Sequence, residues 1–274
     1  MKKIAFFLFV AICLLHTACV VRTEPLRLSV DGENTRLAYG VDISITPMTG
    51  VTMGRRLITI APEQEGLTYT LYGYFNGQIV SKTKNTVLVL NGLYLEQNGA
   101  KSALRCTAKT EIRTVDGSRN YIISSGRSYA KDGALHGKRD LVLGGSGTLY
   151  VKGSVWHGIE GDDVKIKGSG SLYVEGSRRG AALDCESLTV EPEKTFSAYF
   201  LNAKYGIKAD DSVKIASGNF FLYDNDTALK AGTIALKGGL FRILGNRQLF
   251  IARKGPCDTA GAQVITEEKD DLSE

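Results

Sequence analysis

The chain has 274 residues, of which 43% are hydrophobic and 23% charged, with 31 Gly and 5 Pro. This composition is that of an ordinary globular protein and argues against a disordered chain, a collagen or a polytopic membrane protein. The formal net charge is +5, and residues 19–266 alone carry +7, because residues 1–18 hold two Lys and no acid while residues 267–274 hold five acids and one Lys. Such a basic body favours anionic partners.

Residues 1–18 have the pattern of a secretory signal peptide. Two lysines precede a twelve-residue apolar run, Ile4 to Leu15, as in the charged and apolar regions of such signals. The run is shorter than the roughly 20 residues that span a bilayer. Residues 15–19 (Leu-His-Thr-Ala-Cys) resemble a bacterial lipobox in which His16 replaces the usual Leu. We therefore expect export to the bacterial cell envelope and lipidation at Cys19, with ordinary signal cleavage or an incidental Cys as alternatives.

Residues 19–56 show no clear periodicity and are predicted to be a linker and a cap over the first strands, which would otherwise expose an unpaired edge. Short segments rich in β-branched and aromatic residues follow, and each is predicted to be a strand. They are Leu57–Ile60, Tyr69–Leu71, Gln78–Val80, Thr86–Leu90 and Tyr121–Ile123. The dipeptides Asn91-Gly92, Asn98-Gly99 and Asp116-Gly117 are predicted to form turns between them.

The second half of the chain is a repeat. Gly133, Gly158, Gly180, Gly206 and Ala228 open units at spacings of 25, 22, 26 and 22 residues. Each unit holds a strand, a Gly or Ser turn, a second strand, another turn and a short apolar arm, with no helical spacing. Stacking such units about 4.8 Å apart predicts a parallel β-helix, whereas a β-propeller needs repeats of about 40 residues or more.

Alternation within the repeat predicts one inward-facing apolar pair in each strand. In the first strands the pairs are Leu141 and Leu143, Val164 and Ile166, Leu188 and Val190, Val213 and Ile215, and Ile234 and Leu236. In the second strands they are Leu149 and Val151, Leu172 and Val174, Ala198 and Phe200, Phe220 and Leu222, and Phe241 and Ile243.

Pro256 and the acidic last residues predict that the β-helix ends at residue 252 and that residues 253–274 are a linker and charged tail. Beyond Cys19, three scattered cysteines remain as free thiols, so no disulfide framework is expected. They are Cys106, Cys185 and Cys257.

Gly-rich and Asp-rich segments occur in an order that resembles a known family. The segments include Val87-Leu88-Val89-Leu90-Asn91-Gly92, Lys131-Asp132-Gly133-Ala134, Asp140-Leu141-Val142-Leu143-Gly144-Gly145 and Gly206-Ile207-Lys208-Ala209-Asp210-Asp211. Over about residues 57–252 the chain is similar to the secreted bacterial carbohydrate-binding β-helix family that includes polygalacturonate-binding members.

The resemblance implies an all-β fold: a right-handed, single-stranded, pectate-lyase-like parallel β-helix, here of about eight or nine coils. It also implies calcium at Asp-rich turns and binding to acidic glycans, without demonstrated lyase chemistry. The family tends to place Asp before the Gly of each arm, and here only Asp132-Gly133 keeps that pattern. His157, Arg179 and Tyr205 hold the equivalent positions.

Three aspartates are the candidate metal ligands. Asp162, Asp184 and Asp210 each lie four residues after the opening Gly of a unit, so stacking predicts a column of carboxylates. Like charges about 5 Å apart repel, and Ca²⁺ would relieve the repulsion. The alternative is that these are turn aspartates exposed to water. Calcium is the one cofactor that the sequence suggests, since no Walker or GxGxxG motif is present.

Outward positions of the second strands predict an aromatic column: Tyr150, Tyr173, Tyr199 and Phe221, ending at Arg242. Aromatic rings that face solvent can stack on sugars, although a ladder that only stabilises the sheet has the same pattern. Lys165 and Lys214 face outward on the adjoining strands, where they either meet carboxylates of an acidic glycan or are simply solvated.

The leading functional hypothesis is a non-catalytic, extracellular protein that binds an acidic polysaccharide. A polysaccharide lyase or hydrolase is the first alternative, although enzymatic signatures are thin, since beyond the signal only His136 and His157 remain as histidines. A structural or adhesive solenoid is the second. We expect neither a nucleic-acid partner nor a membrane contact other than the lipid at Cys19.

Overall fold

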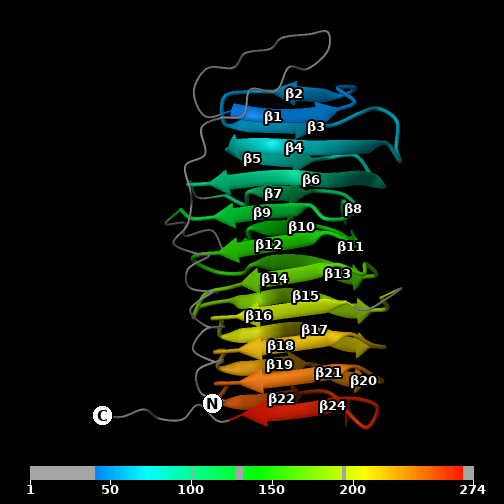
Figure 1. Cartoon of the computed structure of the whole chain (residues 1–274), viewed down its shortest axis with the longest axis vertical. Coiled ribbons are helices and arrows are strands. Elements are labelled where there is room, and N and C mark those ends of the chain that lie inside the picture. Colours follow the sequence, from blue (N-terminus) through cyan, green and yellow to red (C-terminus); the bar gives the residue numbers. More distant parts are fainter. Residues whose placement is uncertain (1–40, 100, 127–131, 193–195, 268–274) are drawn as a thin grey trace. The chain divides into compact units, whose positions relative to one another are not determined.

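The computed structural model describes residues 41–99, 101–126, 132–192 and 196–267. The chain divides into two units, Met1–Arg36 and Leu37–Glu274, and every described residue belongs to the second. These residues form strands and turns and contain no helix (Figure 1). Nothing in the described part therefore forms a helix long and apolar enough to span a membrane. The predicted signal peptide and Cys19 lie outside the described residues.

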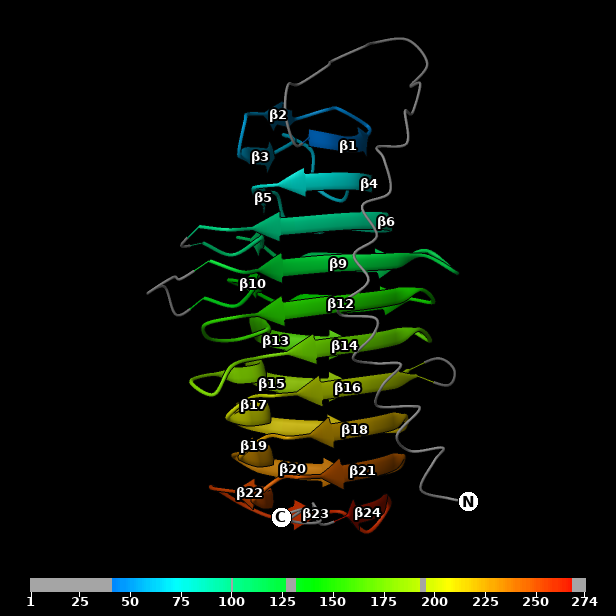
Figure 2. The same ribbon diagram turned by 60° about the vertical axis from the view of Figure 1, so that its left-hand side comes forward.

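Strands stack into three parallel sheets, which each coil visits in the same order (Figures 1 and 2). The first sheet contains β3 (Leu57–Ile60), β5 (Gln78–Ser81), β7 (Leu104–Cys106), β10 (Leu135–Gly137), the first parts of β13 (Ile159–Ile166), β15 (Ala181–Val190) and β17 (Tyr205–Ile215), then β19 (Thr227–Ala231) and β22 (Gln248–Ala252).

The second sheet contains the first parts of β4 (Thr68–Asn76) and β6 (Thr86–Gln97), then β8 (Thr110–Thr114), β11 (Leu141–Gly145), the second parts of β13, β15 and β17, then β20 (Thr233–Leu236) and β23 (Cys257–Asp258). The third sheet contains the second parts of β4 and β6, then β9 (Arg119–Ser124), β12 (Thr148–Gly153), β14 (Ser171–Glu175), β16 (Ser197–Leu201), β18 (Asn219–Tyr223), β21 (Leu240–Leu244) and β24 (Gln263–Glu267).

Eight parallel pairings join the nine strands of the third sheet within the described residues, so about eight turns separate β4 from β24. In Figure 1 these strands lie in front and point to the left while the chain descends, which is a right-handed turn. The predicted right-handed parallel β-helix is confirmed, and the segments predicted as early strands lie in β3, β4, β5, β6 and β9.

The core is the set of inward side chains of all three sheets. All ten predicted inward pairs are buried, with exposed fractions of 5% or less, so the predicted alternation is confirmed. Equivalent residues stack from coil to coil, and the Phe220 and Phe241 rings lie 4.7 Å apart and nearly parallel. Burying each such large side chain contributes about 1.5–3 kcal/mol. The core therefore runs along the length of the stack.

Asparagine side chains hold the corner between the third sheet and the first. The Asn225 side chain accepts a hydrogen bond from the Ala203 N–H at 3.1 Å and donates to the Phe200 carbonyl at 3.0 Å. Asn246 repeats the arrangement one coil later, where its Oδ1 accepts from the Asn225 N–H at 3.2 Å. These bonds satisfy buried backbone groups where the strands stop pairing. They also link each of these two loops to the loop of the preceding coil.

The N-terminal end of the β-helix is covered by antiparallel strands. β1 (Val41–Thr46) pairs with β4, and β2 (Val51–Met53) pairs with β3. Residues 41–53, within the segment predicted to be a linker and cap, thus pair with the first strands of the β-helix. The predicted turn at Asn91-Gly92 is a bend within β6, where the strand passes from the second sheet to the third. Gly92 there has a φ of +85°, and an added Cβ would lie 3.1 Å from the Tyr72 ring.

The predicted C-terminal boundary at residue 252 is wrong. β23 and β24 pair in parallel with β20 and β21, so residues 253–267 complete a further coil. Pro256 lies in a loop before β23, where it needs no ladder hydrogen bond, and its carbonyl accepts one from the Ile234 N–H at 3.0 Å. The remainder of the predicted tail, 268–274, lies outside the described residues.

Candidate functional site

The predicted aromatic column exists and is longer than expected. Cross-strand pairing aligns Tyr150, Tyr173, Tyr199 and Phe221 and ends the column at the exposed Arg242, as predicted. Upstream, the same column continues through Tyr121, Tyr94 and Tyr74. From Tyr121 to Phe221, successive ring centroids lie 4.3–4.8 Å apart with interplanar angles of 15° or less. The column therefore runs along the outside of the third sheet.

The rings of this column contact one another through their faces. Tyr173, for example, lies between Tyr150 at 4.7 Å and Tyr199 at 4.3 Å, and all three side chains are half-buried. A sugar that stacks on an aromatic ring needs the ring face, which the neighbouring rings already cover. The edges of the rings are the parts that point away from the sheet. The role of the column in ligand binding stays a prediction.

Lys165 and Lys214 lie in one outward column of the second sheet, separated by Thr189, and both are exposed. Their predicted orientation is confirmed. Lys165 forms an ion pair with Glu191 at 2.7 Å, which the sequence analysis did not anticipate. Their contact with a ligand stays a prediction.

The predicted column of Asp162, Asp184 and Asp210 is wrong in register. Asp184 is paired with Glu160 on one side and Lys208 on the other, whereas Asp162 and Asp210 lie two residues beyond those partners. The error comes from Gly180, which opens its unit two residues early, so that Leu183 aligns with Ile159 and Ile207. The three carboxylates therefore do not form the proposed calcium site, and calcium binding by the protein stays a prediction.

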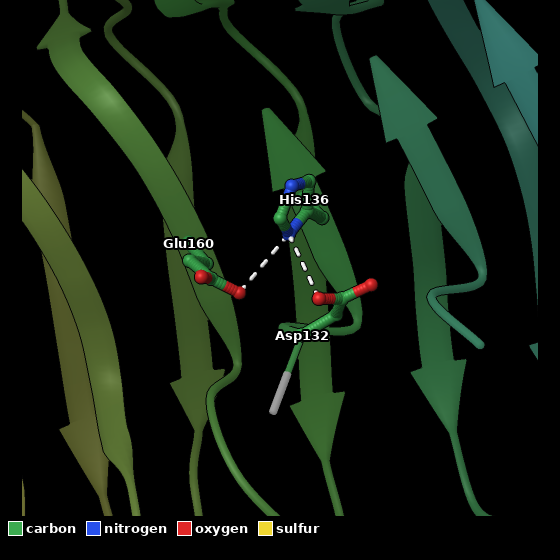
Figure 3. A group of neighbouring side chains, drawn as sticks. All are labelled: Asp132, His136 and Glu160. Carbon is green, nitrogen blue, oxygen red and sulfur yellow. Dashed lines mark hydrogen bonds and ion pairs between the residues drawn. The ribbon is translucent and has the colours of Figure 1, made fainter. Parts of the chain in front are cut away.

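Charged side chains instead form two groups of ion pairs on neighbouring coils of the first sheet, which we call the network. In the first coils of the network, the Arg105 guanidinium contacts the Asp132 carboxylate at 2.9 Å. His136 Nδ1 faces two carboxylates, Glu160 Oε2 at 3.0 Å and Asp132 Oδ1 at 3.8 Å (Figure 3). The Gly133 N–H also donates to Glu160 Oε2 at 2.7 Å. Burial alone raises the pKa of Glu160, but the hydrogen bonds from His136 and Gly133 outweigh it and lower that pKa.

The network continues through the next coils. Asp184 contacts Lys208 Nζ at 2.8 Å and His157 Nδ1 at 3.3 Å, and Asp210 contacts Arg253 at 3.1 Å. Burial lowers the pKa of His157, although the Asp184 carboxylate alone would raise it. The geometry supports the lowered pKa, because the Ala181 N–H donates to His157 Nδ1 at 3.0 Å and occupies the nitrogen that faces Asp184.

A second group of side chains lies on the loops that join the third sheet to the first. We call residues 153–158, 176–180, 202–204, 224–226 and 245–247 the corner loops. They carry the half-buried Trp156 and the exposed Arg178, Arg179, Lys204 and Arg247. The Lys204 N–H donates to the carbonyls of Ser177 and Gly180 at 3.0 and 2.9 Å, which stacks its loop directly on the previous one. The loops that carry these cations on adjacent coils thus lie side by side.

Gly180 allows neighbouring corner loops to stack closely. A Cβ on Gly180 would lie 2.4 Å from the Trp156 carbonyl carbon, a distance that real Cβ atoms do not reach. The one Trp of the chain and the Arg178-Arg179 pair therefore belong to neighbouring loops that only glycine can bring together. Arg178 also forms an ion pair with Asp226 at 3.5 Å, two coils further on.

Sequence analysis missed the first-sheet network because its members are far apart in the chain. His136 and Glu160 are 24 residues apart, and neither belongs to a short metal or catalytic motif. The signal was nevertheless present: placing Leu135 beside Ile159, two apolar arm residues, puts His136 beside Glu160.

These features define the class of the protein, a parallel β-helix with an aromatic column, an ion network and basic corner loops on its outside. Residues 55–190 match a protein-family model described as carbohydrate-binding domain-containing protein. The predicted resemblance to a carbohydrate-binding β-helix family is thereby confirmed.

The fold is also similar to the solved structure of a polysaccharide lyase-like protein from C. thermocellum. The two share 17% sequence identity with a TM-score of 0.49, over 81% of this chain and 91% of that one. None of the curated proteins matches the chain.

Proposed function

We propose that the protein is a non-catalytic carbohydrate-binding protein whose ligand is an acidic polysaccharide. The family match over residues 55–190 supports the carbohydrate. The observation that carries the acidic ligand is the set of exposed cations on stacked corner loops, Arg178 and Arg179 on one coil and Lys204 on the next. Guanidinium groups bind carboxylates through two parallel hydrogen bonds.

The repeat of the coils suits a long polymer. Corner loops recur about every 4.8 Å along the axis, and a sugar ring is of similar length. A polymer on the corner loops would meet their cations on one side and the edges of the aromatic column on the other, because β12, β14 and β16 lead directly from the column into these loops. Many weak contacts then act together, so long polymers bind better than short oligomers.

Binding of polygalacturonate and of its methyl-esterified form tests this proposal with the full-length protein. The two polymers have the same sugar and linkage, and they differ in the methyl group that removes the carboxylate charge. We expect binding to the acidic form that weakens with added salt, and little binding to the ester. Equal binding to both forms would contradict the acidic ligand.

Two double variants locate the site. Arg179→Gln with Lys204→Gln removes two cations from the corner loops, and Lys165→Gln with Lys214→Gln removes two from the second sheet. At about 0.5–1 kcal/mol for each exposed charge contact, the first pair should weaken binding roughly five- to thirtyfold. The second pair is the matched control and should change binding little. The reverse result would place the polymer on the second sheet, as the sequence pattern of the lysines suggests.

Polysaccharide cleavage is the second candidate function, and one observation favours it. Glu160 and Asp184 are paired side by side on the first sheet with His136 and His157 beside them, and carboxylates beside a base can serve acid–base chemistry. Incubation with the same polymers, followed by measurement of new reducing or unsaturated ends, distinguishes the two functions. Cleavage that is lost in Glu160→Gln would replace the non-catalytic proposal.

Export and lipid anchoring at Cys19 belong to the same proposal and are supported by the signal-like residues 1–18. A bacterial envelope location matches an extracellular polysaccharide ligand. Expression of the wild type and of Cys19→Ser in a bacterial host tests the anchor. We expect the wild type in the membrane fraction and the variant in a soluble fraction, and membrane association of both would refute the anchor.

A further inference from the structure

We propose that Asp132, His136 and Glu160 form a binding site for a first-row divalent transition metal, with Zn²⁺ preferred over Ca²⁺. This is the group of three metal-ligating side chains that the described residues bring together, with one ligand atom of each lying within 4.8 Å of the other two. The inference is independent of the proposed carbohydrate function.

The distances between ligand atoms fit such a metal. His136 Nδ1 lies 3.0 Å from Glu160 Oε2 and 3.8 Å from Asp132 Oδ1. Two ligands bound at about 2.1 Å are about 3.0 Å apart at an octahedral angle and about 3.4 Å apart at a tetrahedral one. The observed values bracket these separations. The two separations that involve His136 therefore need to change by only a few tenths of an ångström to accommodate a metal, and the two carboxylate oxygens lie within 4.8 Å of each other.

Neighbouring groups hold the ligands in this arrangement. Arg105 binds the other oxygen of Asp132, Oδ2, at 2.9 Å, which leaves Oδ1 directed at His136. The Gly133 N–H binds Glu160 Oε2 at 2.7 Å. Figure 3 shows both carboxylates directed at the same ring nitrogen, with Glu160 on the adjacent strand. Such outer hydrogen bonds orient ligands in metal sites.

The burial of His136 and the kinds of ligand atom determine which class of metal the site prefers. His136 is 9% exposed, so its imidazole has little water to replace. A nitrogen ligand with two carboxylates suits zinc, manganese or iron, whereas Ca²⁺ prefers oxygen ligands alone. The two carboxylates and the guanidinium of Arg105 carry a formal net charge of −1 around the imidazole, which attracts a cation.

Metal titration of the full-length protein, freed of metal with chelator, tests the site. Zn²⁺ in competition with a chromophoric chelator should bind at one ion per chain, and Ca²⁺ should not displace it at equal concentration. Co²⁺ should give visible absorption bands whose position and intensity change in His136→Gln, because these bands depend on the donor atoms and the nitrogen ligand is lost. The absence of Zn²⁺ binding, or displacement by equimolar Ca²⁺, would overturn the proposal.

Isosteric variants locate the ion. Asp132→Asn and Glu160→Gln keep the size and most hydrogen bonds of the side chains and should each weaken Zn²⁺ binding about tenfold or more. Asp184→Asn removes a carboxylate from the next coil of the same network and should weaken the affinity much less, because Asp184 is not one of the ligands. An equal loss in all three variants, or no loss in the first two with folding preserved, would show diffuse attraction to charge and refute the site.

Discussion

Replacing one tyrosine in the middle of the aromatic column should destabilise the protein by an amount that the stacking geometry sets. Tyr173 has a ring on each face, Tyr150 at 4.7 Å and Tyr199 at 4.3 Å, with interplanar angles of 15° and 4°. Aromatic pairs contribute about 0.5–1.5 kcal/mol each beyond the area they bury. Tyr173→Ala removes two pairs and should lower the free energy of unfolding by about 1–3 kcal/mol.

The end of the column provides a matched comparison. Tyr74 has one ring neighbour in the column, Tyr94, at 5.5 Å and tilted by 33°. Tyr74→Ala should therefore cost at most half as much as Tyr173→Ala. Tyr173→Phe keeps the ring and both stacked neighbours, so it should cost less than Tyr173→Ala.

Thermal unfolding followed by circular dichroism measures these differences. For a domain of this size, 1 kcal/mol corresponds to about 2–4 °C in Tm, so Tyr173→Ala should melt about 2–12 °C below the parent. The column would have no structural role if Tyr173→Ala melted within about 1 °C of the parent. A Tyr74→Ala variant as unstable as Tyr173→Ala would show that stacking is not the source of the effect.

Three further outcomes follow from the structure. Val164→Asp should unfold the protein, because an unpaired buried charge costs several kcal/mol. Lys165→Asp, on the exposed side of the same strand, should leave the protein folded. Circular dichroism measures the folding of both variants, and equal behaviour would contradict the assignment of inward and outward residues in this strand. Burial lowers the pKa of His157, and Ala181 donates to its Nδ1, so its contribution to stability is complete above the unfolded pKa of about 6.5 and is lost as pH falls from there toward the folded pKa. Melting curves recorded from about pH 7.5 to about pH 5.5, a range that includes that value, should show a smaller loss of stability in His157→Gln than in the parent, and an equal loss would refute this assignment. Gly180→Ala should displace the corner loops through its 2.4 Å backbone clash and weaken polymer binding, and unchanged melting and binding would show that the loops tolerate the extra methyl group.

Period-two alternation made the core predictable. Every strand of a β-helix buries one face, so inward pairs such as Leu172 and Val174 follow from the sequence alone. The aromatic column followed from the same rule, because outward positions are fixed once inward ones are. The orientation of the rings did not follow, since it depends on side-chain rotation and on contacts between coils. The stacked faces therefore became visible only in the folded chain.

Register between coils was harder to predict than alternation within them. Corner loops differ in length, so counting from the opening Gly misplaced Asp184 by two residues relative to Asp162, and the apolar arm residues were the better guide. Pro256 was interpreted as the end of the pattern, although loops between strands accept proline readily. Both errors come from treating turn residues as markers of position when the packed apolar residues set the register.

The hydrogen bonds between coils run along the axis of the β-helix. Tension applied along that axis would therefore act on every interface between coils in series. The weakest interface between coils then sets the force at which the stack yields. β23 pairs with β20 at only two positions, Ile234 with Cys257 and Ala235 with Asp258, whereas β15 and β17 pair along most of their length. The last coil, formed by β22 to β24, should therefore detach more easily than the coils around β15 and β17, and its 20 residues from Gln248 to Glu267 would lengthen the molecule by about 70 Å.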